Sequence, residues 1–158
     1  MKILGKTFLP ILACVLFLLA VGIFTPWEPA AAAQADHARV IVYYFHGNYR
    51  CPTCKKIERL SHETVVDNFK KELSKGELIY RVVNVEEPGN RHFVDDFGLF
   101  TKSIVLVEER DGKTVRHKNL SKIWVLIGDE KAFKDYVKEE VAAFMKQAGI
   151  EKADARGV

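Results

Sequence analysis

Apolar positions change their period several times along the chain, and each change marks an expected element. The run Arg39–Phe45 is rich in β-branched and aromatic residues without clean alternation, which is typical of a central strand covered on both faces. Further strands are expected at Glu77–Val85 and in the continuous apolar run Ile104–Val107. Asp111-Gly112 is a two-residue hairpin signal into a fourth strand, Lys113–Lys118, whose charged side chains suit an exposed edge.

Helical spacing fills the intervals before the third strand. A helix begins at Pro52 and is expected to break near Leu60. Ser61 has the side chain of an N-cap, so a second helix should start there and carry its apolar face to Gly76. A short helix is expected at Arg91–Phe97, after a turn rich in Pro, Gly and Asn.

Two more helices are expected after the hairpin. Ser121 can cap a short helix that Gly128 ends, and Asp129 can cap a long one. The long helix has apolar residues at helical spacing along one face: Phe133, Val137, Val141, Phe144 and Ala148. The expected order, strand–helix–strand–helix–strand–strand–helix, is that of an α/β domain.

The N-terminal segment has the pattern of an export element. Lys2 and Lys6 precede the uncharged run Phe8–Phe24, and the positive-inside rule places the rest of the chain across the membrane. This run of 17 residues is longer than an ordinary signal-peptide core and near the lower limit for a spanning helix. Two interpretations therefore stay open: cleavage after Ala33 or Ala35, or an uncut N-terminal membrane anchor.

The expected domain organisation follows from this pattern. Residues 1–35 form a signal peptide or anchor helix, residues 36–150 one domain, and residues 151–158 a polar tail. We expect an extracytoplasmic location, in the periplasm or on the outer face of the cytoplasmic membrane. The 24 basic and 21 acidic residues nearly balance and no basic run is long, which argues against a nucleic-acid partner.

Two cysteines stand at the mouth of the first helix, directly after the central strand. Pro52 fits the first helical turn because its missing N–H would have no partner there, and helical spacing sets Cys51 and Cys54 on the same side. Unpaired amides and the macrodipole favour an anion at a helix N-terminus, so Cys51 should be the more acidic and exposed thiol. Three basic neighbours add positive potential: Arg50, Lys55 and Lys56. We expect Cys51 to attack and Cys54 to resolve.

Two other roles for the cysteine pair stay open. Cys51, Cys54 and His46 could bind Zn or Cu, because soft thiolates with imidazole suit these metals. A structural disulfide is the other role, although so short a loop gives little stabilisation. His46 could instead tune Cys51 or bond within its loop. Tyr49 is a candidate for a partner-docking rim together with Arg50, whereas four other aromatic residues are expected in the core: Tyr43, Tyr44, Phe45 and Trp124.

Three segments of the chain resemble the family named nitrophenyl compound nitroreductase subunit ArsF: Tyr43–Glu58, Arg81–Val85 and Asn119–Trp124. The resemblance covers nearly all of the exported domain. It implies a thioredoxin-like fold, with a central mixed four-stranded sheet flanked by helices and a redox-active CxxC, an inference that CxxC near a βαβ pattern also supports. The family name implies a part in reducing nitroaromatic compounds. The sequence has no Gly-x-Gly-x-x-Gly and no phosphate loop, so no cofactor is expected besides the disulfide.

One departure from thioredoxins concerns the segment before the third strand. Thioredoxins hold a cis proline there, whereas this chain has Phe100-Thr101-Lys102-Ser103. A cis bond without proline costs ~3 kcal/mol, so we expect a trans loop, an altered groove and a dedicated dithiol or disulfide protein partner. The expected function is an exported thiol–disulfide oxidoreductase. The alternative is a metal-binding or electron-transfer accessory subunit with no turnover of its own.

Overall fold

The computed structural model describes residues 38–150. The predicted signal or anchor segment, its cleavage sites and the polar tail lie outside the described residues. Within residues 38–150, no helix has both the length and the apolar character needed to cross a membrane.

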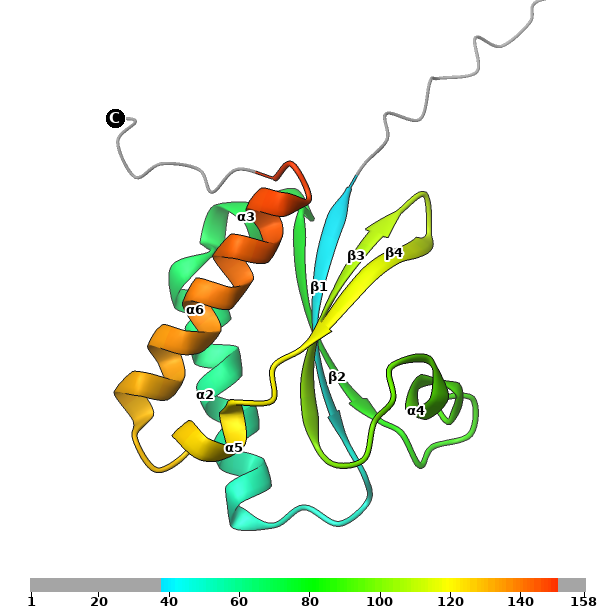
Figure 1. The fold of residues 1–158 in the computed structure, drawn as a ribbon, viewed down its shortest axis with the longest axis vertical. Coiled ribbons are helices and arrows are strands. Elements are labelled where there is room, and N and C mark those ends of the chain that lie inside the picture. Colours follow the sequence, from blue (N-terminus) through cyan, green and yellow to red (C-terminus); the bar gives the residue numbers. More distant parts are fainter. Residues whose placement is uncertain (1–37, 151–158) are drawn as a thin grey trace, which may run out of the picture. The chain divides into compact units, whose positions relative to one another are not determined.

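A single four-stranded mixed sheet forms the centre of this domain, with the strand order β2-β1-β3-β4 (Figure 1). The strands are β1 (Arg39–His46), β2 (Leu78–Asn84), β3 (Ser103–Arg110) and β4 (Lys113–Asn119). β1 pairs in parallel with β2 and antiparallel with β3, and β4 pairs antiparallel with β3. The parallel pair requires a crossover connection, which the helices after β1 provide.

The central strand β1 contributes to two hydrophobic clusters on opposite faces of the sheet. Alternate side chains Val40, Val42 and Tyr44 belong to the larger cluster. Their neighbours Ile41, Tyr43 and Phe45 belong to the smaller one. All six are buried, which confirms the prediction of a strand covered on both faces.

Within residues 38–150, five helices flank the sheet. They are α2 (Pro52–Asn68), α3 (Lys70–Lys75), α4 (His92–Asp96), α5 (Ile123–Leu126) and α6 (Glu130–Gln147). Figure 1 shows α2 and α6 together on one side of the sheet and the short α4 on the other. The predicted apolar face of α6 is confirmed, because Phe133, Val137, Val141, Phe144 and Ala148 are all buried in the larger cluster.

The predicted break near Leu60 is wrong, because α2 continues without interruption through this position. Ser61 is buried inside the helix, where its hydroxyl donates to the Glu58 carbonyl (3.0 Å) and shares a hydrogen bond with the Tyr80 hydroxyl (2.8 Å). These bonds satisfy the hydroxyl without an N-cap. The helix ends at Phe69 instead, whose backbone leaves the helical region with φ −133° and ψ 37°.

Of three other local predictions, two helix caps and a hairpin, one is wrong and two are confirmed. The N-cap of α5 is Lys122, without a side-chain hydrogen bond, so the prediction that Ser121 caps this helix is wrong. Asp129 does cap α6, since its carboxylate accepts a 3.0 Å hydrogen bond from the N–H of Ala132. The hairpin at Asp111-Gly112 is also confirmed. Both residues have positive φ, 50° and 75°, as a two-residue hairpin turn requires.

A buried carboxylate ties the end of α6 to the sheet. Glu108 accepts hydrogen bonds from the guanidinium groups of Arg110 (2.8 Å) and Arg116. The same two arginines donate at 3.0 Å to carbonyls at the end of α6, Arg116 to Phe144 in the last turn and Arg110 to the C-cap Ala148. Burial by itself raises the pKa of Glu108, but the hydrogen bonds and charges of the arginines outweigh it and hold the pKa below its usual value.

Candidate active site at the Cys51–Cys54 disulfide

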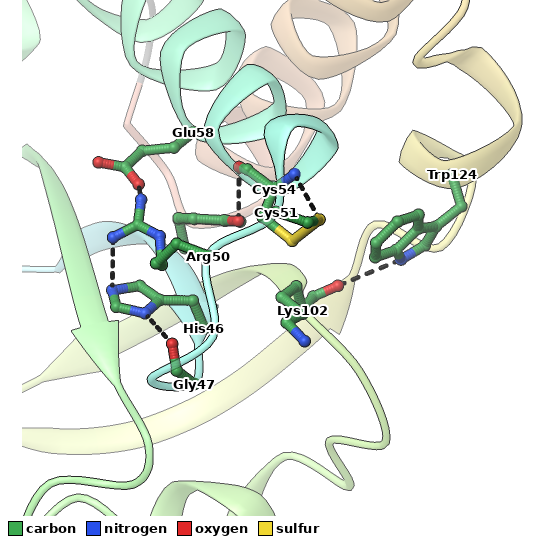
Figure 2. The surroundings of a disulfide bond; sticks show 9 residues. His46, Gly47, Arg50, Cys51, Cys54, Glu58, Lys102 and Trp124 are labelled. Atoms are coloured by element: carbon green, nitrogen blue, oxygen red, sulfur yellow. Dashed lines mark hydrogen bonds and ion pairs between the residues drawn. A yellow bond between two sulfur atoms is a disulfide. The ribbon is translucent and has the colours of Figure 1, made fainter.

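The two cysteines meet at the N-terminus of α2. Cys51 is the N-cap, with extended backbone (φ −71°, ψ 163°), and Pro52 opens the helix. The sulfurs form a disulfide across a Cα–Cα distance of 5.1 Å (Figure 2). Cys51 is partly exposed, whereas Cys54 is only 1 % exposed. The predicted arrangement is confirmed in its geometry: a partly exposed cysteine at the helix start and a buried one a turn further on.

The Cys51 sulfur occupies the place of a capping acceptor. Its Sγ accepts a hydrogen bond of 3.2 Å from the N–H of Cys54. The first amides of a helix have no partner inside the helix, and the helix dipole adds positive potential at the same point. A thiolate formed at Cys51 on reduction of the disulfide would therefore be stabilised by the backbone of α2 itself.

The basic neighbours contribute less than the sequence suggested. Arg50 pairs with the carboxylate of Glu58, and Lys56 lies 3.3 Å from a carboxylate oxygen of Glu130. Two of the three cations are thus balanced by acids. Lys55 is exposed and makes no ion pair among the described residues. The start of α2 supplies positive potential at Cys51 that does not depend on these three side chains.

His46 stands at the end of β1, and both of its ring nitrogens have partners. Nδ1 lies 2.8 Å from the carbonyl of Gly47, and Nε2 lies 3.3 Å from a guanidinium nitrogen of Arg50 (Figure 2). Donation from Nδ1 to the carbonyl leaves Nε2 as the acceptor for Arg50. Within residues 38–150, no three or more His, Cys, Asp or Glu side chains are grouped as metal ligands. The alternative ligand set Cys51, Cys54 and His46 is not assembled in this arrangement.

Tyr44 on β1 forms a hydrogen bond to the cysteine turn. Its hydroxyl is buried and donates a 2.8 Å hydrogen bond to the carbonyl of Cys54. Burial raises the pKa of Tyr44 to about 12, against the opposing charge of Arg50, so the phenol stays a neutral donor at ordinary pH. The sequence predicted a core side chain here, which is confirmed, but it gave no sign of this bond.

The loop before β3 lies next to the disulfide. Figure 2 shows Lys102 beside the two cysteines, with its carbonyl accepting a 3.1 Å hydrogen bond from the indole N–H of Trp124. The described residues contain no cis peptide bond, which confirms the predicted trans loop. Trp124 was expected in the core, and this is wrong: 37 % of it is exposed, because its ring bridges α5 to this loop.

Two exposed aromatic side chains lie close in sequence to the site: Tyr49 before the cysteine turn, and Phe100 in the loop before β3. Tyr49, two residues before Cys51, is 75 % exposed, and Phe100 is fully exposed. A residue that docks a partner has to be exposed, and Tyr49 of the predicted docking rim is exposed. Arg50, its other predicted member, is half-buried against Glu58 instead.

Comparison with known proteins gives a distant likeness. No protein-family model matches the chain. No curated protein matches it either. Among solved structures, thioredoxin f2 of Chlamydomonas reinhardtii matches with 17 % identity over 63 % of this chain and 83 % of that one, at a TM-score of 0.33. A likeness this distant bears no weight for activity, so the strand order and the helix headed by Cys51 decide the fold.

The fold is thioredoxin-like. A parallel β1–β2 pair joined through α2, an antiparallel β3–β4 hairpin and a closing α6 form the mixed sheet flanked by helices that the sequence predicted. On this thioredoxin-like frame, the disulfide lies at the end of the central strand and on the first turn of the following helix. The arrangement suits reversible exchange, in which an external thiol attacks the Cys51–Cys54 disulfide or the reduced Cys51 attacks an external disulfide.

Proposed function

We propose that the chain is an exported thiol–disulfide oxidoreductase in which Cys51 attacks and Cys54 resolves. One observation carries the proposal: Cys51 is a partly exposed residue whose sulfur caps α2, while its disulfide partner Cys54 is buried. An incoming sulfur can approach Cys51 but not Cys54, and the helix terminus favours the Cys51 thiolate.

The chemistry proceeds in two exchanges. In the reducing direction, the Cys51 thiolate attacks one sulfur of a substrate disulfide, that bond breaks, and the first substrate thiolate leaves. Cys54 then gives up its proton and attacks Cys51 in the mixed disulfide, which expels the second substrate thiolate. The protein disulfide forms and two electrons pass to the substrate. The reverse sequence oxidises a substrate dithiol.

The setting of this chemistry is proposed from the sequence. Lys2, Lys6 and the apolar run Phe8–Phe24 support an extracytoplasmic location, as a cleaved or anchored protein. The resemblance of Tyr43–Glu58 to the ArsF family supports a role in a nitroaromatic-reducing system. The partner in that system is a protein with a dithiol or a disulfide. The dithiol is the only redox group the proposal needs.

The test uses the full chain, with Cys14→Ser as the matched control because this cysteine lies in the N-terminal segment. Cys14→Ser should keep the wild-type rate of protein disulfide reduction, whereas Cys51→Ser should abolish it. Cys54→Ser should stop after one half-reaction, with the substrate trapped on Cys51. Full turnover by Cys51→Ser would refute the proposal. Stoichiometric Zn or Cu(I) binding by the reduced chain, without turnover, would instead favour the accessory-subunit alternative.

A further inference from the structure

A small hollow opens between the turn that follows β1 and the loop that precedes β3. Its volume is about 180 Å³. Five apolar side chains line it: Phe45, Val85, Val94, Leu99 and Phe100. His46, Gly47 and Lys102 also line it, and Figure 2 shows these three around the disulfide. Neither cysteine lines the hollow, but these three residues belong both to its lining and to the surroundings of the disulfide.

One wall of the hollow is built by a glycine and a glutamate. A Cβ atom at Gly47 would clash with Oε1 of Glu86, so the glutamate side chain lies directly over the glycine. Asn84 fixes this wall, because its amide donates to the Asn48 side chain (2.7 Å) and its side-chain oxygen accepts from the N–H of Glu86 (3.1 Å). These bonds join the turn after β1 to the turn after β2.

Two other lining residues, Phe100 and Lys102, have side chains that could contact a partner. Phe100 lines the hollow yet is fully exposed. Lys102 makes no ion pair within residues 38–150 and lies beside the disulfide (Figure 2). A hollow lined by apolar side chains, with an exposed aromatic ring and a lysine that makes no ion pair among the described residues, is complementary to an apolar side chain with a neighbouring carboxylate.

We propose that this hollow is a side-chain specificity pocket for the protein partner. The partner segment is extended and has the order reactive cysteine, acidic residue, apolar residue. The apolar side chain occupies the hollow, and the acidic side chain pairs with Lys102. Glu86 on the far wall disfavours a second acid beyond the apolar residue. This inference rests on the proposed attack by Cys51 and adds the class of segment that Cys51 prefers.

The test measures capture by the full chain carrying Cys14→Ser and Cys54→Ser. Short peptides each hold one cysteine as a mixed disulfide with 2-nitro-5-thiobenzoate. Cys51 displaces the coloured thiolate and forms the peptide–protein disulfide, so absorbance follows the rate. Four peptides differ only after the cysteine: aspartate–leucine, glycine–leucine, aspartate–glycine and glycine–glycine. Burial of the leucine side chain should make capture of the aspartate–leucine peptide about tenfold faster than capture of the aspartate–glycine peptide.

Two variants address the pocket, each with a matched control on β4. Thr101→Trp, at an exposed lining position, should fill the hollow and abolish the leucine preference, whereas its control Val115→Trp should keep that preference. Lys102→Glu should reverse the aspartate preference, whereas Lys113→Glu, exposed on β4, should keep it.

The outcomes separate this inference from the proposed function. Equal rates for all four peptides, or a leucine preference that survives Thr101→Trp, would overturn the specificity pocket and leave the thiol chemistry in place. Failure to capture any peptide would overturn the attack by Cys51 and the inference with it.

Discussion

Replacing Glu108 by glutamine tests how the domain holds α6 against the sheet. The Glu108 side chain is 4 % exposed and is bonded by Arg110 and Arg116, whose side chains are 34 % and 31 % exposed. Breaking a fully buried ion pair costs about 3–5 kcal/mol, because the partner charge is left uncompensated. Here water reaches both guanidinium groups and glutamine keeps one acceptor oxygen, so we expect a loss of about 2 kcal/mol.

Urea unfolding of the full chain, followed by circular dichroism, measures this loss. The midpoint should fall without a change in slope, and the melting temperature should drop by roughly 8 °C, since ~1 kcal/mol corresponds to ~4 °C at this size. Glu139→Gln is the matched control, because Glu139 is exposed on α6 and has no ion pair among the described residues. A Glu108→Gln loss no larger than that of the control would show that the buried carboxylate does not anchor α6.

Three further predictions follow. Tyr44→Phe removes the hydrogen bond to the Cys54 carbonyl, so the free energy of unfolding should fall by about 1 kcal/mol with disulfide exchange retained, and an unchanged urea midpoint would show that this bond is not stabilising. The pKa of Glu108 is held below its unfolded value, so its contribution to stability is present above about pH 4 and lost as the pH falls through the folded pKa; Glu108→Gln should flatten the acid-unfolding profile, and parallel profiles would contradict this. A reporter fused after Ala38 should be active only outside the cytoplasm, and cytoplasmic activity would refute export.

The strands and the last helix were predictable because their signals are local and have one physical meaning. Arg39–Phe45 has too many apolar residues for a half-exposed strand, and β1 is indeed buried on both faces. Asp111-Gly112 allows the positive φ angles of a tight hairpin. Asp129 precedes a long apolar stripe, and it caps α6.

Serine was the source of both wrong caps. A serine hydroxyl can accept from the first amides of a helix or donate back to a carbonyl within one, and the sequence alone does not choose between them. Ser61 donates to the Glu58 carbonyl in the middle of α2, where Tyr80 from β2 completes its bonding. This second partner is distant in sequence. At α5, the helix starts after Lys122, and Ser121 lies in the preceding turn.

The cysteine positions at the candidate site were predictable, but their surroundings were not. CxxC at a helix start determines which sulfur is exposed, as Cys51 shows. The Arg50–Glu58 pair joins a residue before α2 to one inside it, outside any helical pairing rule, so the neutralisation of Arg50 was missed. The contact of Trp124 with Lys102 likewise depends on how α5 docks on the loop before β3.

The most direct test of the account is the order in which the two thiols of the reduced chain react. Full-length protein carrying Cys14→Ser is reduced, treated with brief pulses of iodoacetamide across a range of pH, and mapped by mass spectrometry. Cys51 should be alkylated first, with a pH midpoint below the ~8.5 of a free cysteine, because it caps α2 and is accessible. Faster alkylation of Cys54, or two midpoints equal to that of a free cysteine, would contradict the assignment of Cys51 as the attacking thiol.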